Sequence, residues 1–275
     1  MKADKLLSIL IPAYNYPEGV ERIIKPFLKI DPKILRNIEF IISDDSNSAR
    51  AKDKIKKIVC FYTNKQDLNM FYISGPKSKN PVDNWNELIE KSRGKYKQII
   101  HHDDFFKSHT DIKRLLDLLN SDKYDVYILK LYTIDNFYYY NHIPNLIINF
   151  LLSYFVCSIN LVNFIGPSAC VVFRARCEKK FNRMLRWIVD VDWFYRIFSD
   201  SNKIFFSNSI SIVSEKHFAK SITNTIEEPK IFVKLKELVQ INFKFNFFHF
   251  IFLVFWPVIK IYILLTNFFT RTPIR

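Results

Sequence analysis

The chain has 275 residues, of which 49% are hydrophobic and 16% aromatic, so it holds enough apolar material for one sizeable domain with an appendage or for two small domains, and too much for a disordered chain. It contains only four glycines and neither G-x-x-x-x-G-K-[ST] nor G-x-G-x-x-G, which argues against a Gly-rich phosphate loop and leaves a metal ion or basic side chains to hold any phosphate. The net charge of +14 suits an anionic partner, namely nucleic acid, anionic lipid or a phosphorylated substrate.

Neither the cysteines nor the N-terminus indicates a secreted protein. The four cysteines form no C-x-x-C pair and show no zinc-type spacing to histidine, so we expect free buried thiols in a reducing compartment. The short apolar run near the N-terminus is interrupted by Pro12 and lacks the layout of a signal peptide.

Strand and helix patterns alternate along the first hundred residues. Apolar runs predict buried parallel strands at 6–13 and 38–43, and we expect a third strand at 71–74 and a fourth at 95–100. Helical patterns lie between them at 20–30, 49–59 and 82–94, the last with a glycine stop at Gly94. This order predicts an α/β domain with a parallel sheet.

Polar clusters follow three of these strands, namely Tyr14–Asn15, Asp44–Asp45 and His102–Asp104. Ligands of parallel sheets bind beyond the carboxyl ends of the strands, so we expect the three clusters to converge at one edge. The alternative is that each cluster only caps a helix or forms a turn.

The second half of the chain is less regular. Residues 108–122 predict an amphipathic helix with a capping pattern at Ser108 and Asp111, and residues 124–135 predict one long strand or a strand pair. Residues 136–173 contain no Asp, Glu, Lys or Arg, and the core at 146–165 is about as long as a membrane span. Because Asn and Ser recur through that core, we expect helices that cover an acceptor cleft or touch a membrane surface, rather than a span.

The tail is apolar and basic. Residues 247–269 contain a single lysine, Lys260, and a central Pro257. Such a stretch can span a bilayer, lie in its interface, or pack as an ordinary helix on the preceding domain. We therefore predict two parts, an α/β domain over 1–228 and a membrane-associating tail over 229–275.

Four segments of the chain indicate one protein family, namely SILIPAYN, IEFIISDDS, a helix ending in SRGKY, and IIHHDD. With these segments taken together, the chain resembles the family-2 inverting glycosyltransferases with the GT-A fold over roughly residues 5–225. The resemblance implies an α/β, Rossmann-like, mostly parallel sheet flanked by helices. It also implies that the first loop lines a nucleotide-base pocket, through Pro12, Ala13, Tyr14 and Asn15.

The same resemblance assigns further donor-site residues. Asp44 matches the aspartate that reads the uracil edge or the ribose, and Asp45 beside it is expected to be structural. Asn86 falls at the family's asparagine position, and Trp85 takes a place often held by arginine.

The stretch IIHHDD matches the family's D-x-D metal motif with a departure. His101 occupies the position of the first aspartate in the family motif, and His102 occupies its variable position. The resemblance implies that Asp103 contacts the metal directly, and that Asp103 and His102 also contact the nucleotide sugar. The resemblance implies Mn²⁺ or Mg²⁺, with His101 and the downstream His217 as further candidate ligands.

Asp190 and Asp192 open a helical pattern where the family carries a variant of E-D-x-D-L. The resemblance makes Asp190 the catalytic base and Asp192 a supporting carboxylate. An inverting transfer needs such a base to take the proton of the acceptor hydroxyl. The alternative is a pair of charges favoured by the helix dipole.

The expected function is a metal-dependent transfer of a sugar, from a nucleotide-sugar donor of the UDP type to a glycan or lipid-linked acceptor. Bacterial surface polysaccharide or lipooligosaccharide synthesis at the cytoplasmic face of the inner membrane fits the basic apolar tail. A second interpretation, prompted by His101, is a non-catalytic nucleotide-binding or assembly module. Nucleic-acid binding is not expected, since no nucleic-acid module is recognisable.

Overall fold

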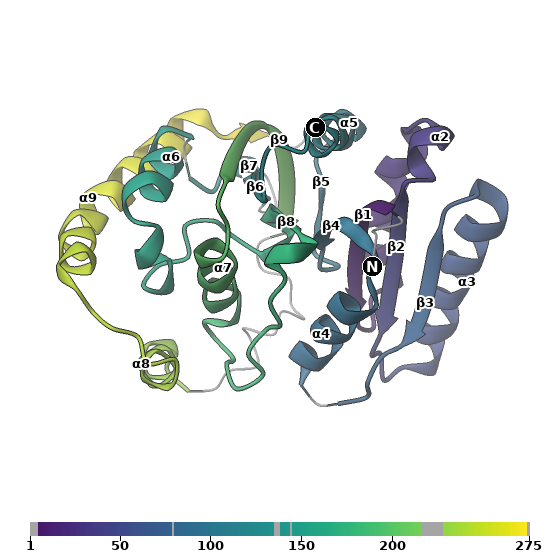
Figure 1. The fold of residues 1–275 in the computed structure, drawn as a ribbon, viewed down its shortest axis with the longest axis horizontal. Helices are drawn as coiled ribbons and strands as arrows, with labels where there is room; N and C mark the ends of the chain where they lie inside the picture. The colour runs from purple at the N-terminus through teal and green to yellow at the C-terminus, as the bar shows by residue number, and fades with distance from the viewer. Residues whose placement is uncertain (1–4, 79, 135–137, 144, 216–227, 274–275) are drawn as a thin grey trace.

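The computed structural model describes residues 5–78, 80–134, 138–143, 145–215 and 228–273 (Figure 1). The strands are β1 (Lys5–Ala13), β2 (Ile38–Asp44), β3 (Met70–Ser74), β4 (Gly94–Ile99), β5 (Asp104–Phe106), β6 (Val126–Ile134), β7 (Tyr138–Asn141), β8 (Val171–Arg174), β9 (Ile204–Glu215) and β10 (Thr272–Pro273). The α-helices are α1 (Pro17–Ile24), α2 (Pro32–Leu35), α3 (Ala49–Gln66), α4 (Pro81–Lys91), α5 (His109–Asn120), α6 (Asn145–Tyr154), α7 (Val189–Ser199), α8 (Lys230–Gln240) and α9 (Phe247–Thr270). Short 3₁₀ helices are η1 (Lys25–Lys29), η2 (Val156–Asn160), η3 (Ser168–Cys170) and η4 (Ala175–Cys177).

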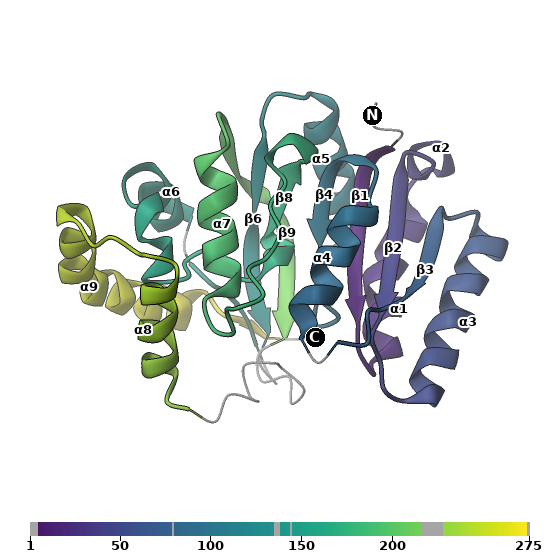
Figure 2. The same cartoon turned by 60° about the horizontal axis from the view of Figure 1, so that its bottom comes forward.

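The first part of the sheet is parallel, in the order β3-β2-β1-β4. All seven residues of β2 and the last seven of β1 are buried, which explains why their sequences are mostly apolar and do not alternate. Helix α4 packs on β1 and β2, while α1 packs against α3 (Figure 2). The four predicted parallel strands are confirmed.

The second part of the sheet is joined by antiparallel pairings. Strand β8 runs antiparallel to both β4 and β6, and β9 pairs in parallel with β6 and antiparallel with β5. Residues 126–134 form one long strand, which resolves the alternative left open at 124–135. The β5–β9 pairing brings residues 104–106 beside residues 212–214, more than a hundred positions away along the chain.

Some predicted boundaries were wrong. Gly94 does not stop a helix: α4 ends at Lys91, and Gly94 begins β4. A Cβ at Gly94 would lie 2.4 Å from Oγ of Ser8, so its small size serves the close approach of β4 to β1. The predicted helix at 20–30 is divided into α1 and η1, because Pro26 has no N–H to donate to an α-helical ladder.

The segment 136–173, which contains no Asp, Glu, Lys or Arg, forms short helices rather than one long helix. Its described part contains β7, α6, η2 and η3, and its longest helix, α6, has ten residues. That length is about half of what a bilayer requires. All four cysteines are free, as expected, but only Cys170 and Cys177 are buried, whereas Cys60 is exposed.

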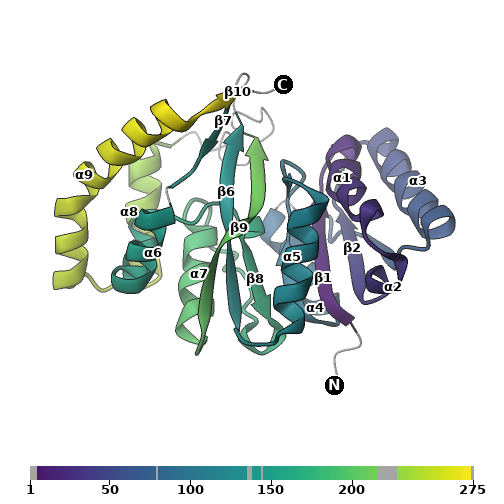
Figure 3. The same cartoon turned by 90° about the horizontal axis from the view of Figure 1, so that it is seen from above.

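The C-terminal helices lie at the end of the molecule opposite α3 (Figures 2 and 3). Among the described residues one helix, α9, is long and apolar enough to cross a membrane, judged by length and composition alone. Only 17% of its most apolar window is buried. The helix contacts η2 and β7 on one side and leaves most of its side chains exposed.

Candidate active site

The turn between β4 and β5 carries the His-His-Asp-Asp stretch to the carboxyl edge of the parallel strands. The amide of Asp104 donates to the carbonyl of His101 at 2.9 Å, which closes the turn. Helix α1 passes directly against it, and a Cβ at Gly19 would lie 2.5 Å from the carbonyl oxygen of His102. His101, His102 and Asp103 are left partly exposed, whereas Asp104 is buried.

A cavity of about 620 Å³ opens beside this turn. It is lined by residues from the ends of β1, β2 and β4, from the loop after β3 and from the start of α4, namely Pro12, Ala13, Tyr14, Asp45, Ser46, Asn47, Lys52, Lys77, Ser78, Pro81, Asn84, Trp85, His101 and His102. The predicted convergence of the three polar clusters is therefore observed. The volume lies in the range of small-molecule and cofactor sites.

The first two clusters are bound to each other by hydrogen bonds. Asn15 adopts a left-handed conformation with φ of 51°, and its amide N–H donates to Oγ of Ser46 at 2.7 Å. Its side chain donates to Oδ1 of Asn47 at 2.6 Å and accepts from the amide of Ser48 at 3.1 Å. Asn15 thus shapes one wall of the cavity by joining two loops, while Tyr14 faces the cavity.

The two aspartates after β2 have different surroundings. Asp44 is buried, is not among the lining residues, and accepts hydrogen bonds from the amide of Ser46 at 2.9 Å and the hydroxyl of Tyr72 at 2.9 Å. Asp45 lines the cavity and accepts from the amide of Lys77 at 2.9 Å. Burial raises the pKa of Asp45, against the lowering effect of that hydrogen bond. The carboxylate that faces the cavity is the one we expected to be structural.

Helix α4 contributes Asn84 and Trp85 to the cavity rather than Asn86. The Asn86 side chain donates to the carbonyl of Phe181 at 3.0 Å and accepts from its amide at 2.7 Å, so it holds the segment before α7. Asn84 is 3% exposed, and its Oδ1 has no hydrogen-bond partner among the described residues. Trp85 packs edge-on against His101, with ring centroids 4.9 Å apart.

Two cations of the cavity, Lys52 and Lys77, were not singled out by sequence reasoning. Both occur in lysine-rich stretches where no single lysine stands out. The signal that would have found Lys77 is its place in the loop that follows β3, since loops at this edge of a parallel sheet carry ligand contacts.

A group of carboxyls lies beside the turn. Burial and, to a smaller extent, the charge of Asp103 together raise the pKa of Asp190 to about 7. Burial, then the charges of Asp103 and Asp190, raises the pKa of Asp104, while a Ser214 hydrogen bond and Arg22 lower it. Oδ1 of Asp190 and Oδ1 of Asp104 are buried, with no hydrogen-bond partner among the described residues. The start of α7 and the metal-motif turn thus form one acidic site.

Asp192 lies apart from this acidic site. Its Oδ2 accepts from Nε of Arg196 at 3.0 Å and from the other guanidinium nitrogen at 2.7 Å. It lines a second cavity, of about 390 Å³, between α7, η2 and the α8–α9 connection. Both predicted carboxylates open α7, but only Asp190 interacts with Asp103.

The residues fit a divalent cation in part. Burial lowers the pKa of His101 to about 4, so its imidazole is neutral, as a metal ligand must be. Asp103 and the unpartnered oxygen of Asp190 are the hard donors that Mn²⁺ and Mg²⁺ prefer. However, no group of three or more His, Cys, Asp or Glu placed to hold a metal is found within the described residues. His217 lies outside them.

An ion pair supports the turn from behind. Arg22 of α1 pairs with Glu215 at the end of β9 and donates to the carbonyl of His102 at 3.0 Å. The guanidinium also lies 4.5 Å from the ring centroid of Phe105. Arg22 thus joins α1, the turn and β9.

A parallel sheet with a cavity at its carboxyl edge, next to clustered carboxyls, defines an α/β protein that binds a small polar ligand. The family model for glycosyl transferase family 2 matches residues 8–183, which is more than half of the chain, and the chain belongs to this family. The predicted family and its GT-A fold are confirmed.

Solved structures share the fold at low sequence identity. The S. aureus TarS fragment 1–349 in complex with UDP-GlcNAc has a TM-score of 0.62 at 16% identity, covering 86% of this chain and 66% of that one. The mannosyltransferase PcManGT from Pyrobaculum calidifontis, in complex with GDP-Man and Mn²⁺, has a TM-score of 0.55 at 10% identity, covering 76% and 56%. A longer TarS structure is matched over 44% of its length. No curated protein matches the sequence significantly.

Proposed function

We propose that the protein is an inverting glycosyltransferase that moves a sugar from a nucleotide-sugar donor, of the UDP type, to a glycan or lipid-linked acceptor. The observation that carries the proposal is a half-buried carboxyl, Asp190, whose Oδ1 is buried without a partner among the described residues, beside the turn that borders the cavity. Family membership and the UDP-GlcNAc bound by TarS support the donor class.

The cavity has groups suited to each part of a nucleotide. Asp45 and Asn84 offer acceptor oxygens to the N–H or hydroxyl groups of a base and ribose. Lys52 and Lys77 bring positive charge toward a diphosphate, which replaces the glycine-rich loop that the chain lacks. Tyr14 offers a partly exposed ring against which a base can stack.

Asp190 is assigned as the base. A carboxyl whose pKa is near 7 takes up the proton of an attacking hydroxyl more readily than one near 4, because proton affinity rises with pKa. The acceptor oxygen then attacks the anomeric carbon on the face opposite the leaving nucleotide. Asp192 is assigned a supporting role through its pair with Arg196, which fixes the second turn of α7.

Asp103 and His101 are the described residues that we assign to a divalent cation, with His217 as the further candidate. When bound, Mn²⁺ or Mg²⁺ supplies positive charge that stabilises a leaving diphosphate. We also assign His102 and Asp103 to the nucleotide sugar, because His102 lines the cavity and Asp103 follows it in the same turn.

The direct test measures nucleotide release from UDP-, GDP- and dTDP-sugars with Mn²⁺, with and without a membrane extract as the acceptor source. We expect release from a UDP-sugar, reduced about 10³-fold or more in Asp190→Asn and Asp103→Asn. Asp53→Asn, which alters an exposed carboxylate in a surface ion pair with Lys57, is the matched control. Full turnover in Asp190→Asn would contradict the proposal.

The second candidate is a non-catalytic nucleotide-binding or assembly module. It is favoured by His101 at the first metal position, and by the lack of a three-ligand metal group among the residues the structure describes. UDP binding by calorimetry without release from any donor, also with membrane extract present, is the outcome that selects it.

We assign the protein to the cytoplasmic face of the cell membrane, held by its C-terminal helices. Helix α8 turns apolar side chains outward, and α9 exposes a longer series. The exposed apolar residues of α8 are Ile231, Phe232, Leu235 and Val239. Since α9 packs along the domain through His249, Phe252 and Ile263, we propose that it lies in the interface rather than crossing the bilayer. A surface-glycan or lipooligosaccharide acceptor at that membrane follows from this location.

A further inference from the structure

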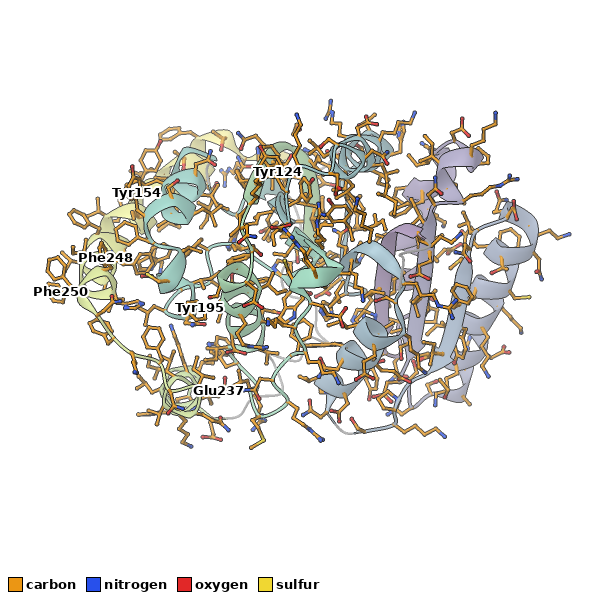
Figure 4. All side chains as sticks on the ribbon, in the orientation of Figure 1. Tyr124, Tyr154, Tyr195, Glu237, Phe248 and Phe250 are labelled. Atoms are coloured by element: carbon orange, nitrogen blue, oxygen red, sulfur yellow. The ribbon has the colours of Figure 1, made fainter. Side chains whose placement is uncertain are left out.

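Helix α8 inserts a carboxylate beneath the start of α7. Glu237 is 4% exposed, and its side chain accepts hydrogen bonds from three successive backbone amides. Oε1 accepts from Arg186 at 2.6 Å and Trp187 at 3.2 Å, and Oε2 accepts from Trp187 at 3.0 Å and Ile188 at 2.9 Å. Figure 4 labels Glu237 on α8, below the α7 residue Tyr195.

One of these amides, that of Ile188, belongs to the donors that the start of α7 leaves without a partner, and the other two lie in the turn that leads into the helix. Ile188 is the N-cap of α7, and no side chain among the described residues caps it in the usual way, since isoleucine has no oxygen to offer. Successive N–H groups in a turn form a concave site that favours an anion, and the helix dipole adds to that preference. A buried carboxylate is costly unless its lone pairs are filled, and here four hydrogen bonds fill them.

The rest of the inward face of α8 holds it in this position. Lys230 lies over the ring of Trp187 at 5.2 Å, and Lys234 donates to the carbonyl of Leu161. Lys230, Lys234 and Glu237 are spaced at i, i+4 and i+7, so they share one side of the helix. The buried residues of α8 are therefore Glu237 together with Val233 and Leu238, while four apolar side chains of the same helix face outward.

From this contact we infer that Glu237 is a positioning residue for catalysis, which holds the approach to α7 so that Asp190, two residues after Ile188, keeps its place in the acidic site. The inference rests on the proposed role of Asp190 as base. It places part of the active site's support in residues 229–275, a segment beyond the match to the family model. Truncating the tail would then impair chemistry as well as location.

The test compares Glu237→Ala and Glu237→Gln in the full chain by steady-state transfer. We expect kcat to fall about 10- to 100-fold in the alanine variant, since a displaced reacting group costs about that much, with the KM for the donor unchanged within about twofold. We expect kcat to change and the donor KM to stay the same because the donor cavity is lined by residues from the first half of the chain, away from Glu237 in the sequence. The glutamine variant keeps one acceptor oxygen and should recover part of kcat.

Glu228→Gln is the matched control, because Glu228 is an exposed carboxylate just before α8 that pairs with Lys236. It should leave kcat and KM unchanged. Hydrogen exchange reports the contact independently of activity: the amides of 186–188 should exchange faster in both Glu237 variants and at the normal rate in the control.

Unchanged kcat in folded Glu237→Ala would overturn the inference, as would an equal loss in kcat and in donor affinity. If the alanine variant does not fold, the glutamine variant decides by the same two readouts. Failure of the proposed function is distinguishable, since it would appear as full turnover in Asp190→Asn while exchange at 186–188 still responded to Glu237.

Discussion

The chemistry that we propose depends on a few carboxyls whose positions raise the free energy of their charged forms. Asp104 and Oδ1 of Asp190 are buried close to Asp103, and burial together with neighbouring charge raises the pKa of both carboxyls. Keeping such groups ionised lowers the free energy of unfolding. Groups that destabilise the fold in this way are found mainly where their charge serves binding or catalysis. This cost is measurable without knowing the substrate.

Asp190→Asn should stabilise the metal-free protein, increasingly so at higher pH. The folded pKa of about 7 exceeds the ordinary value of 3.8, so the folded state binds the extra proton between these values, and wild-type stability falls as pH rises through that window. Asparagine removes the penalty. Urea unfolding should show little gain near pH 4 and up to about 4 kcal/mol by pH 8. A gain that is independent of pH, or equal in Asp53→Asn, would contradict the assignment.

The two aspartates after β2 should separate into a binding residue and a structural one. Asp45→Asn should raise the Kd for UDP about tenfold, because Asp45 faces the cavity. Asp44→Asn should lower the melting temperature instead, because its two internal hydrogen bonds are weakened, at a cost of about 1–3 kcal/mol. Calorimetry and thermal unfolding of both variants check this; UDP affinity lost only in Asp44→Asn restores the sequence-based assignment.

At the scale of elements, the site depends on how closely α1 approaches the turn between β4 and β5. Gly19 lies in the first turn of α1, and a Cβ there would meet the carbonyl oxygen and Cβ of His102 at 2.5 and 2.8 Å. Arg22 on the next turn of the same helix donates to that carbonyl. Contacts with α1 therefore fix the position of the turn that carries Asp103.

Gly19→Ala should destabilise the protein by about 2 kcal/mol, because the new methyl group clashes with backbone. The direction of the change discriminates clearly, because replacing glycine by alanine in an unobstructed helix raises the free energy of unfolding by about 1 kcal/mol. UDP affinity should fall in parallel, as the turn is displaced from the cavity. Glu18→Ala, at an exposed position one residue earlier, is the comparison by urea unfolding, and a stabilised Gly19→Ala would show that the approach is looser than described.

Across the whole molecule, the sequence predicted most of the parallel half of the sheet. It predicted fewer of the residues that line the candidate site. Buried parallel strands such as β1 and β2 are mostly apolar runs that do not alternate, so the sequence indicates them and the edge where their loops meet. Which of two adjacent carboxylates faces the cavity depends on a contact with Tyr72 from β3, and which asparagine of α4 does so depends on Phe181 from a distant loop. Such tertiary contacts leave no periodic signal.

The tail illustrates the same limit. Composition predicted an apolar helix near 247–269, and α9 confirms it. Nothing in the pattern of α8 predicted that Glu237, its one acidic residue, would be buried against the start of α7, because a lone glutamate among lysines is typical of a solvated helix face. The direction in which α8 faces could be known only from its packing.

The outward apolar faces of α8 and α9 and the net charge of +14 together predict binding to anionic membranes. Phe248 and Phe250 of α9 lie at the outer edge of the molecule (Figure 4). The full chain should co-sediment with vesicles containing phosphatidylglycerol more strongly than with pure phosphatidylcholine vesicles. Salt should weaken only the electrostatic part of the binding, since apolar insertion is not screened.

A variant with four exposed α9 residues changed to serine, Phe248, Phe255, Ile261 and Leu265, should lose most vesicle binding, since each removes apolar area that inserts into the interface. The matched control changes Phe61 and Phe71, equally exposed but on α3 and β3 at the opposite end of the molecule, and should bind vesicles normally. UDP release in solution should be unaffected in both, because α8 and Glu237 are intact. Equal loss of binding in the two variants would mean that the protein adheres through apolar surface in general rather than through these helices.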